Sequence, residues 1–132
     1  MDQIAALAFD PRPLWRKSPF IWGQTDCIMA TCNYIRDRTG IDPAAPWRWS
    51  YDSAEAAQAL WEPWGGVLGL FDHGMARAGF KRAVAPAFGL PVVCDFGGHE
   101  IAGVYIGPIT AFMADGRGCI ETRATVLGVW QI

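Results

Sequence analysis

The sequence predicts an α+β fold in which helices come first and an antiparallel sheet follows. Between residues 27 and 78 the apolar residues recur at helical spacing, whereas after Gly79 short apolar runs alternate with glycine-rich turns. Helices followed by strands favour a small antiparallel sheet packed on the helices that precede it. A chain of 132 residues, 52% of them hydrophobic, is long enough for one core but not two, so residues 1–132 are expected to form a single domain.

The N-terminal stretch from Asp2 to Phe9 is predicted to be a short helix or arm that ends at the two prolines of residues 10–13. A basic and aromatic patch follows, composed of Arg12, Trp15, Arg16 and Lys17. It is either a solvated loop or a contact surface for an acidic partner.

Residues 27–38 have the best-defined helical pattern in the chain. Asp26 is a suitable N-cap, Gly40 is a suitable left-handed C-cap, and Pro43 prevents continuation. The expected buried stripe consists of Ile28, Thr31, Cys32 and Ile35.

An aromatic loop is expected over residues 44–52. Trp47, Trp49 and Tyr51 alternate in it, so an extended segment would present them on one side. They either cover the core edge or form a groove or docking surface. Together with Trp22, the tryptophans at 47 and 49 are the candidate binding residues.

Two more helices are predicted at residues 54–61, capped by Ser53, and 67–78. His73 on the second of these is expected to be a surface or hydrogen-bonded residue. The predicted strands are residues 80–84, 91–95, 101–106, 110–114, 119–123 and 126–131.

Cys27 is the first residue of the predicted helix 27–38. A thiol at a helix N-terminus lies near the positive end of the helix dipole, which favours thiolate and is typical of nucleophilic cysteines. The alternative is that Cys27 is a small buried hydrophobic residue on a core helix.

Composition excludes several classes of function. The net charge of −2 argues against nucleic acid as a partner. The four cysteines form no C-x-x-C pair, so neither a metal nor another cofactor is expected. No apolar run is long enough for a membrane span, and no signal peptide is apparent, so we expect a protein kept reduced in a cytoplasm.

The segment from Phe20 to Cys27 resembles the nucleophile segment of NlpC/P60 cysteine peptidases, which have papain-like α+β domains and cut cell-wall peptides. The pattern aromatic-x-Trp-Gly-x-x-Asp-Cys is followed here by a Thr-Gly-x-Asp-Pro turn at residues 39–43. Both are similar to short NlpC/P60-like proteins encoded beside phage and prophage tail genes. The resemblance covers nearly the whole chain in the order of elements.

The resemblance implies a histidine at the start of a strand that here reads Ile-Ala-Gly-Val-Tyr-Ile-Gly, residues 101–107. Ile101 occupies the histidine position, and no imidazole or carboxylate stands near Met113, where the third polar residue belongs. One route to a catalytic site remains: a bulge at Gly97-Gly98 could bring His99 towards Cys27, with Asp95 or Asp115 to orient the imidazole.

Three functions follow as hypotheses. The first is a degenerate NlpC/P60-like component of a phage or prophage tail, with other tail proteins of the hub or tip as partners. Such a protein would be located in the host cytoplasm during assembly and then in the virion tail. The second is an active cysteine hydrolase that cuts peptidoglycan peptides through Cys27 and His99. The third is a host-encoded module that binds a peptide in the groove without cutting it.

Overall fold

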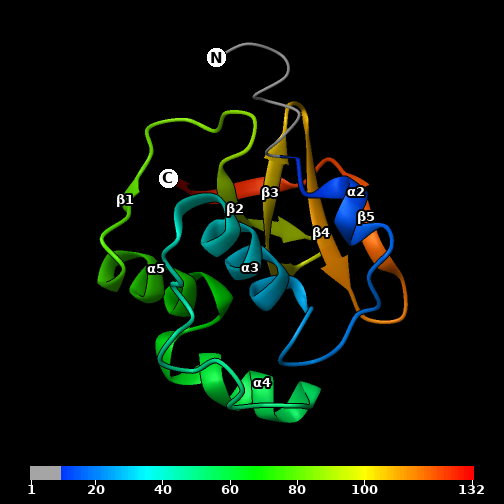
Figure 1. Cartoon of the computed structure of the whole chain (residues 1–132), viewed down its shortest axis with the longest axis vertical. Coiled ribbons are helices and arrows are strands. Elements are labelled where there is room, and N and C mark those ends of the chain that lie inside the picture. The colour runs from blue at the N-terminus through cyan, green and yellow to red at the C-terminus, as the bar shows by residue number, and fades with distance from the viewer. Residues whose placement is uncertain (1–9) are drawn as a thin grey trace.

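The computed structural model describes residues 10–132, so the helix or arm predicted for residues 2–9 lies outside the described part. The described helices come first along the chain (Figure 1). They are α2 (Arg12–Trp15), α3 (Cys27–Thr39), α4 (Ala54–Trp61), the short 3₁₀ helix η1 (Glu62–Trp64) and α5 (Val67–Arg77).

Six strands follow the helices and form one sheet. They are β1 (Lys81–Arg82), β2 (Pro91–Phe96), β3 (His99–Ile106), β4 (Ile109–Ala114), β5 (Gly118–Thr122) and β6 (Thr125–Gln131). The strand order is β1-β6-β2-β3-β4-β5, and each pairing between neighbours is antiparallel. The α+β class and the antiparallel sheet after the helices are therefore confirmed, whereas the papain-like assignment stays a prediction.

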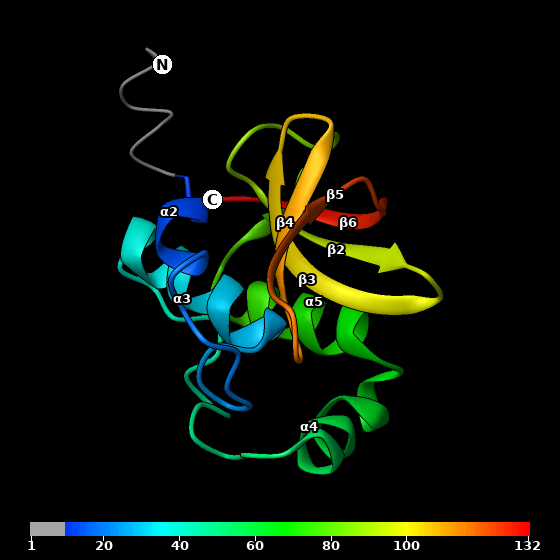
Figure 2. The same ribbon diagram turned by 90° about the vertical axis from the view of Figure 1, so that its right-hand side faces the viewer.

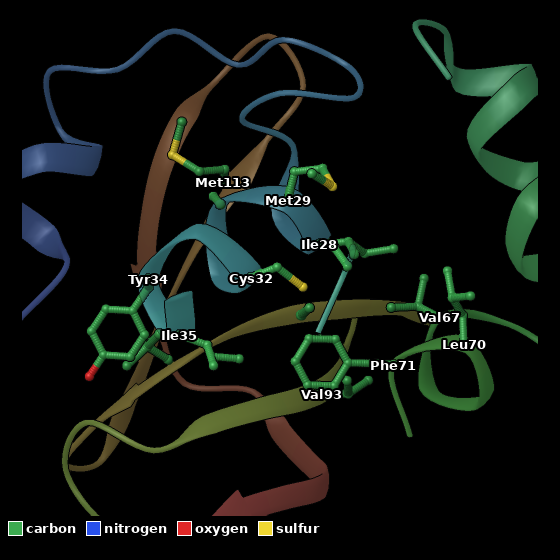
Figure 3. Close-up of a cluster of buried hydrophobic side chains, with 14 of the residues drawn as sticks. Ile28, Met29, Cys32, Tyr34, Ile35, Val67, Leu70, Phe71, Val93 and Met113 are labelled. Carbon is green, nitrogen blue, oxygen red and sulfur yellow. The ribbon is translucent and has the colours of Figure 1, made fainter. Parts of the chain in front are cut away.

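The core lies between one face of the sheet and the helices α3 and α5. Figure 3 shows Ile28, Cys32 and Ile35 of α3 directed towards Phe71 of α5 and Val93 of β2. Figures 1 and 2 both place α3 against the sheet, with α4 lying apart from the strands. Of the residues of α4, only Ala57 is buried. The sheet supports α3 and therefore fixes where Cys27 stands.

Alternate residues of β3 face opposite sides of the sheet. Ala102 and Val104 belong to the buried cluster that includes α3 and α5, whereas Ile101 and Tyr105 pack against a second, smaller cluster on the far face. This is the period of two expected for a strand. This alternation determines which side chains of β3 face α3 and can therefore approach Cys27.

The short helix α2 corrects the prediction of a loop after residue 10. Pro13 stands in its first turn, where proline is tolerated because the missing amide hydrogen would have no helical partner. The predicted first strand is also shorter than expected, since only Lys81 and Arg82 pair with β6.

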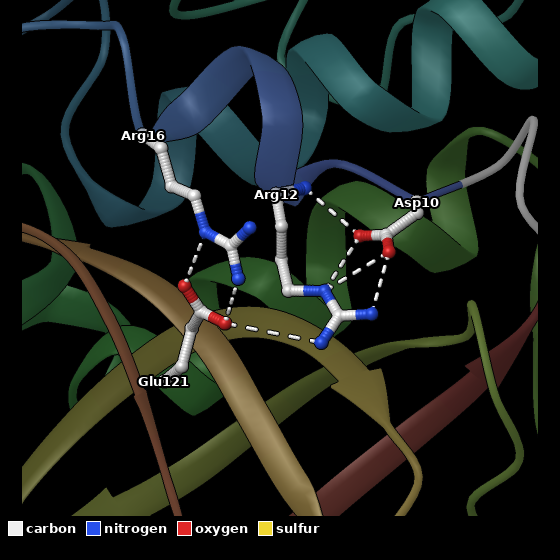
Figure 4. Close-up of polar contacts among 4 residues, drawn as sticks. All are labelled: Asp10, Arg12, Arg16 and Glu121. Carbon is white, nitrogen blue, oxygen red and sulfur yellow. Dashed lines mark hydrogen bonds and ion pairs between the residues drawn. The ribbon is translucent and has the colours of Figure 1, made fainter.

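The basic patch around α2 is occupied by carboxylates of the chain itself (Figure 4). Arg12 binds Asp10 at 2.6–3.0 Å, and Arg16 binds Glu121 of β5 at 2.6 and 2.8 Å. Trp15 is buried. Arg16, and Arg12 at 3.8 Å, pair with Glu121 and hold α2 on β5, whereas the Arg12–Asp10 pair is local to the start of α2.

The aromatic loop is not extended. Residues 43–49 form successive turns, with Trp47 and Tyr51 buried and Trp49 75% exposed. Trp49 also has a φ of 67°, in the left-handed region. The expectation that Trp47, Trp49 and Tyr51 share one side is therefore wrong, because turns do not keep the alternation of a strand.

Candidate functional site

Asp26 organises the junction between the loop and α3. Its side chain accepts hydrogen bonds from the backbone amides of Ile28 and Met29 at 3.1 and 3.0 Å, as an N-cap does. It also accepts from the amide of Gly23 at 2.7 Å and the hydroxyl of Tyr51 at 2.8 Å. Burial raises the pKa of Asp26, and these four hydrogen bonds oppose that rise. The carboxylate is thus committed to holding the loop.

Gly23 is required by this arrangement for two reasons. Its φ is 82°, which side chains other than glycine rarely adopt. A Cβ atom at this position would overlap the backbone carbonyl oxygen of Tyr51. The Gly-x-x-Asp-Cys pattern is therefore explained by the path of the chain around a buried carboxylate.

Cys27 is the first residue of α3, as predicted, and its side chain is partly buried. Burial raises the pKa of Cys27 to about 12, and the neighbouring Asp26 carboxylate adds to the rise. The backbone amides of Ala102, Ile28 and Cys27 itself act in the opposite direction but more weakly. Of the two alternatives for Cys27, this environment favours the structural residue over the activated nucleophile, because desolvation and a like charge both oppose ionisation of the thiol.

The sheet residue beside the sulfur of Cys27 is Ala102, whose backbone amide is close enough to affect the thiol. Ile101, the position at which the resemblance implies a histidine, packs on the far face of the sheet. Met113, near which the third polar residue belongs, is buried in the same cluster as α3. The position of β3 beside the thiol is therefore an alanine, and the β4 residue that the resemblance points to is a buried thioether.

The structure does not bring His99 to Cys27. Gly97 and Gly98 form a two-residue turn with positive φ at both positions, and Phe96 pairs directly with His99. The register between β2 and β3 is continuous, so the bulge that His99 needs is not present there. Because His99 and Ile101 are two residues apart in one strand, His99 has the orientation of the far face. Figure 2 shows this hairpin projecting beyond the helices.

The other polar candidates also lie apart from the thiol. Asp95 is exposed and accepts the amide of Gly98 at 2.9 Å, within the same hairpin turn. Asp115 is exposed in the turn between β4 and β5. His73, the second of the two histidines of the chain, is exposed on α5 and stacks on Trp64 with ring centroids 4.0 Å apart.

The candidate binding tryptophans are divided between core and surface. Trp47 is buried, Trp22 is partly buried with its ring edge-on to Phe20, and Trp49 is exposed. Trp47 belongs to the main buried cluster and Trp22 borders it, so of this set Trp49 is the one that lies on the surface.

Two polar residues of the junction and its surroundings were not anticipated as partners. Tyr51 belongs to the predicted aromatic loop, and its hydroxyl donates to Asp26. Glu100 of β3 accepts the amide of Leu68 at 3.1 Å and so caps the N-terminus of α5. Sequence spacing offers no signal for either contact, because the partners are 25 and 32 residues apart.

A pocket of about 280 Å³ lies between α2 and α3, and Cys27 does not line it. Within residues 10–132 no group of three or more histidine, cysteine, aspartate or glutamate side chains is arranged to hold a metal ion. No helix of that same part of the chain combines the length and the apolar character needed to cross a membrane.

Comparisons with known proteins add the family of the chain. No curated protein and no solved structure matches it. One family model matches residues 13–132, which is most of the chain and includes α3, the junction and the whole sheet. The chain therefore belongs to the domain family of unknown function DUF6950.

Proposed function

We propose that this chain is an NlpC/P60-like, papain-like domain without peptidase activity that serves as a structural or assembly component of a phage or prophage tail. The resemblance of residues 20–27 and 39–43 supports the tail assignment. Its partners are other tail proteins of the hub or tip. It is assembled in the host cytoplasm and carried in the virion tail.

The main support for a loss of peptidase activity is the environment of Cys27. A cysteine peptidase needs a base to activate the thiol and to return the proton to the leaving amine. Here burial and the neighbouring Asp26 carboxylate raise the pKa of the thiol, and Ala102 stands at the strand position beside it. Both histidines of the chain lie on other surfaces.

The alternative is an active hydrolase of peptidoglycan peptides. The observation in its favour is that Cys27 is the first residue of a 13-residue helix and is not fully buried. Such a site would need a base supplied by a movement of the β2–β3 hairpin or by a partner.

The reactivity of the Cys27 thiol distinguishes the inactive domain from the active hydrolase. We expect alkylation of Cys27 by iodoacetamide to be slow at neutral pH and to rise without a plateau up to about pH 10, because the raised pKa keeps the thiol protonated over that range. The measurement uses mass spectrometry in a Cys119→Ser background, since Cys32 and Cys94 are buried. Rapid alkylation with a plateau near neutral pH, together with release of wall peptides that Cys27→Ser abolishes, would establish the hydrolase instead.

The tail assignment is tested on particles. Mass spectrometry of tail particles from the organism that encodes the chain should detect it at a fixed ratio to the tail tip proteins. A Cys27→Ser variant should enter particles as well as wild type does. Absence of the chain from intact tails would refute the assignment, and failure of the folded Cys27→Ser variant to assemble would refute a purely structural role for the junction.

A further inference from the structure

The loop between β1 and β2 exposes an unbroken run of apolar side chains. Residues 83–90 read Ala-Val-Ala-Pro-Ala-Phe-Gly-Leu and contain no charged or hydrogen-bonding side chain. Every residue from 84 to 88 is exposed, and the side chain of Val84 is fully exposed. An apolar run of this length in contact with water is typical of an interaction surface.

Both ends of this loop are held by hydrogen bonds. At its start the amide of Ala83 donates to the carbonyl of Val129 at 2.8 Å. At its end the carbonyl of Gly89 accepts from the Tyr34 hydroxyl at 2.7 Å and from Arg38 at 2.8 Å. The loop is therefore anchored on β6 and α3, and its apolar tip is presented outward.

The turn between β3 and β4 lies at the same end of the molecule as this loop (Figures 1 and 2). Residues 106–109 around that turn read Ile-Gly-Pro-Ile and carry no charge. The amide of Tyr105 donates to the carbonyl of Leu90 at 2.9 Å, which ties the two segments together. One end of the domain therefore presents two uncharged, apolar segments.

Positive charge is in excess at the base of the loop. Lys81 and Arg82 of β1 directly precede it, and Arg38 lies at its other end. Arg82 also pairs with Asp72 at 3.0 Å, and both of these side chains are about half exposed. The charged side chains of β1, of its partner on α5 and of the last turn of α3 are Arg36, Asp37, Arg38, Asp72, Lys81 and Arg82. This excess of cations contrasts with the net charge of −2 of the whole chain and complements an anionic surface.

We propose that the tip of the β1–β2 loop inserts into the headgroup region of an anionic lipid bilayer, with the cations at its base near the lipid phosphates. A bilayer accepts any convex apolar tip, whereas a protein interface carries about one hydrogen bond per 100–200 Å². The side chains of residues 83–90 offer none, which favours the bilayer. The contact is with one membrane surface, and it does not rest on the proposed tail function.

The test is co-sedimentation of the purified full chain with extruded vesicles at about 1 mM lipid, where weak interfacial binding is measurable. The vesicles are phosphatidylcholine, with or without about one third of the anionic lipid phosphatidylglycerol. We expect binding to the anionic vesicles and about five-fold or more weaker binding to the neutral ones. Raising NaCl from about 0.1 M to about 1 M should reduce this difference, because salt screens the charges. No binding to anionic vesicles, or equal binding to both kinds, would overturn the proposal.

Variants separate the apolar tip from the charged base. Val84→Asp, at a fully exposed side chain, should weaken binding to anionic vesicles about five-fold or more, and Phe88→Ser is a second variant of the tip. Lys81→Gln should weaken binding to anionic vesicles about five-fold and leave binding to neutral vesicles unchanged. The matched controls are Leu127→Asp, at an exposed leucine on β6, and Arg117→Gln, at an exposed arginine in the turn before β5. Controls that weaken binding as much as the loop variants would refute the site.

Other occupants of the loop are outcomes of the same experiments. If the chain binds no vesicles but forms a dimer in sedimentation velocity that Val84→Asp dissociates, the loop is an interface between copies and the proposal fails. If it binds no vesicles and Val84→Asp prevents its entry into tail particles, a tail protein covers the loop and the proposal also fails. Vesicle binding is measured on the purified chain, so this proposal and the tail assignment can fail separately.

Discussion

The loop side and the sheet side of the α3 junction differ in how much they depend on specific side chains. On the loop side, Gly23, Asp26 and Tyr51 form a buried network in which the carboxylate accepts four hydrogen bonds. On the sheet side, Cys27 lies beside the backbone amide of Ala102, which acts on the thiol only weakly. The difference indicates that Gly23, Asp26 and Tyr51 serve folding on the loop side, whereas the sheet places the backbone amide and the methyl group of Ala102 beside Cys27.

Gly23→Ala should have the largest effect on stability. The new methyl group would overlap the carbonyl oxygen of Tyr51 at a φ of 82°, so we expect a loss of more than about 3 kcal/mol in the free energy of unfolding. Urea denaturation followed by circular dichroism measures it. Gly40→Ala is the matched control, since its φ is 80° but its Cβ meets no atom within 4 Å. Equal losses in the two variants would show that the loop does not depend on the close approach to Tyr51.

Asp26→Ala should cost about 3 kcal/mol. The variant loses the N-cap of α3 and leaves the buried hydroxyl of Tyr51 without its acceptor. The control is Ser53→Ala, which removes an N-cap that accepts one amide at 3.1 Å, and it should cost about 1 kcal/mol. Thermal unfolding of both variants gives the comparison. A loss at Asp26 no larger than at Ser53 would mean that the network adds nothing to ordinary capping.

The pH dependence of stability should separate Asp26 from the paired carboxylates. Its folded pKa is raised, so its contribution is present below the unfolded value of 3.8 and is lost as the pH rises through the folded value. Wild type should therefore gain stability relative to Asp26→Asn as the pH falls through that window.

Asp42→Asn supplies the opposite case. Burial acts to raise the pKa of Asp42, but hydrogen bonds from Arg48 outweigh it and lower the pKa. Wild type should lose stability relative to this variant as the pH falls through the lowered folded value. Denaturation series of both variants from neutral to acid pH measure the two slopes, and slopes of the same sign would contradict the assignment of Asp26.

Cys27→Ser should have the smallest effect, about 1 kcal/mol or less, because the site is partly exposed and the backbone amide of Ala102 remains near the new hydroxyl. Cys32→Ser is the control: that side chain is fully buried, so its hydroxyl loses water and should cost about 1–3 kcal/mol. Chemical denaturation of both variants is sufficient. A larger loss at Cys27 than at Cys32 would show that the thiol is itself part of the structural network.

Local sequence patterns were sufficient to predict the helices whose caps and hydrophobic periodicity lie within one segment. The helix Cys27–Thr39 has an aspartate N-cap, apolar residues at helical spacing and a glycine C-cap. The helix Ala54–Trp61 has a serine N-cap and several alanines, which favour helix formation. The short helix α2 was missed because its four residues contain a proline and contribute little period. The loop at residues 44–52 was predicted correctly, but the spacing of its aromatics also fitted an extended segment, so the sequence did not predict its successive turns.

The order of helices and strands, the N-terminus of α3 and the position of Cys27 on it were thus determined by the sequence itself, since each depends on neighbours within a few residues. The tertiary structure alone decided what Cys27 faces. The continuous pairing of β2 with β3 directs Ala102 towards the thiol and Ile101 away from it. A shift of one residue in this pairing would move each side chain of the strand to the opposite face of the sheet. Burial of the thiol, which sets its pKa, also depends on packing between segments far apart in the chain.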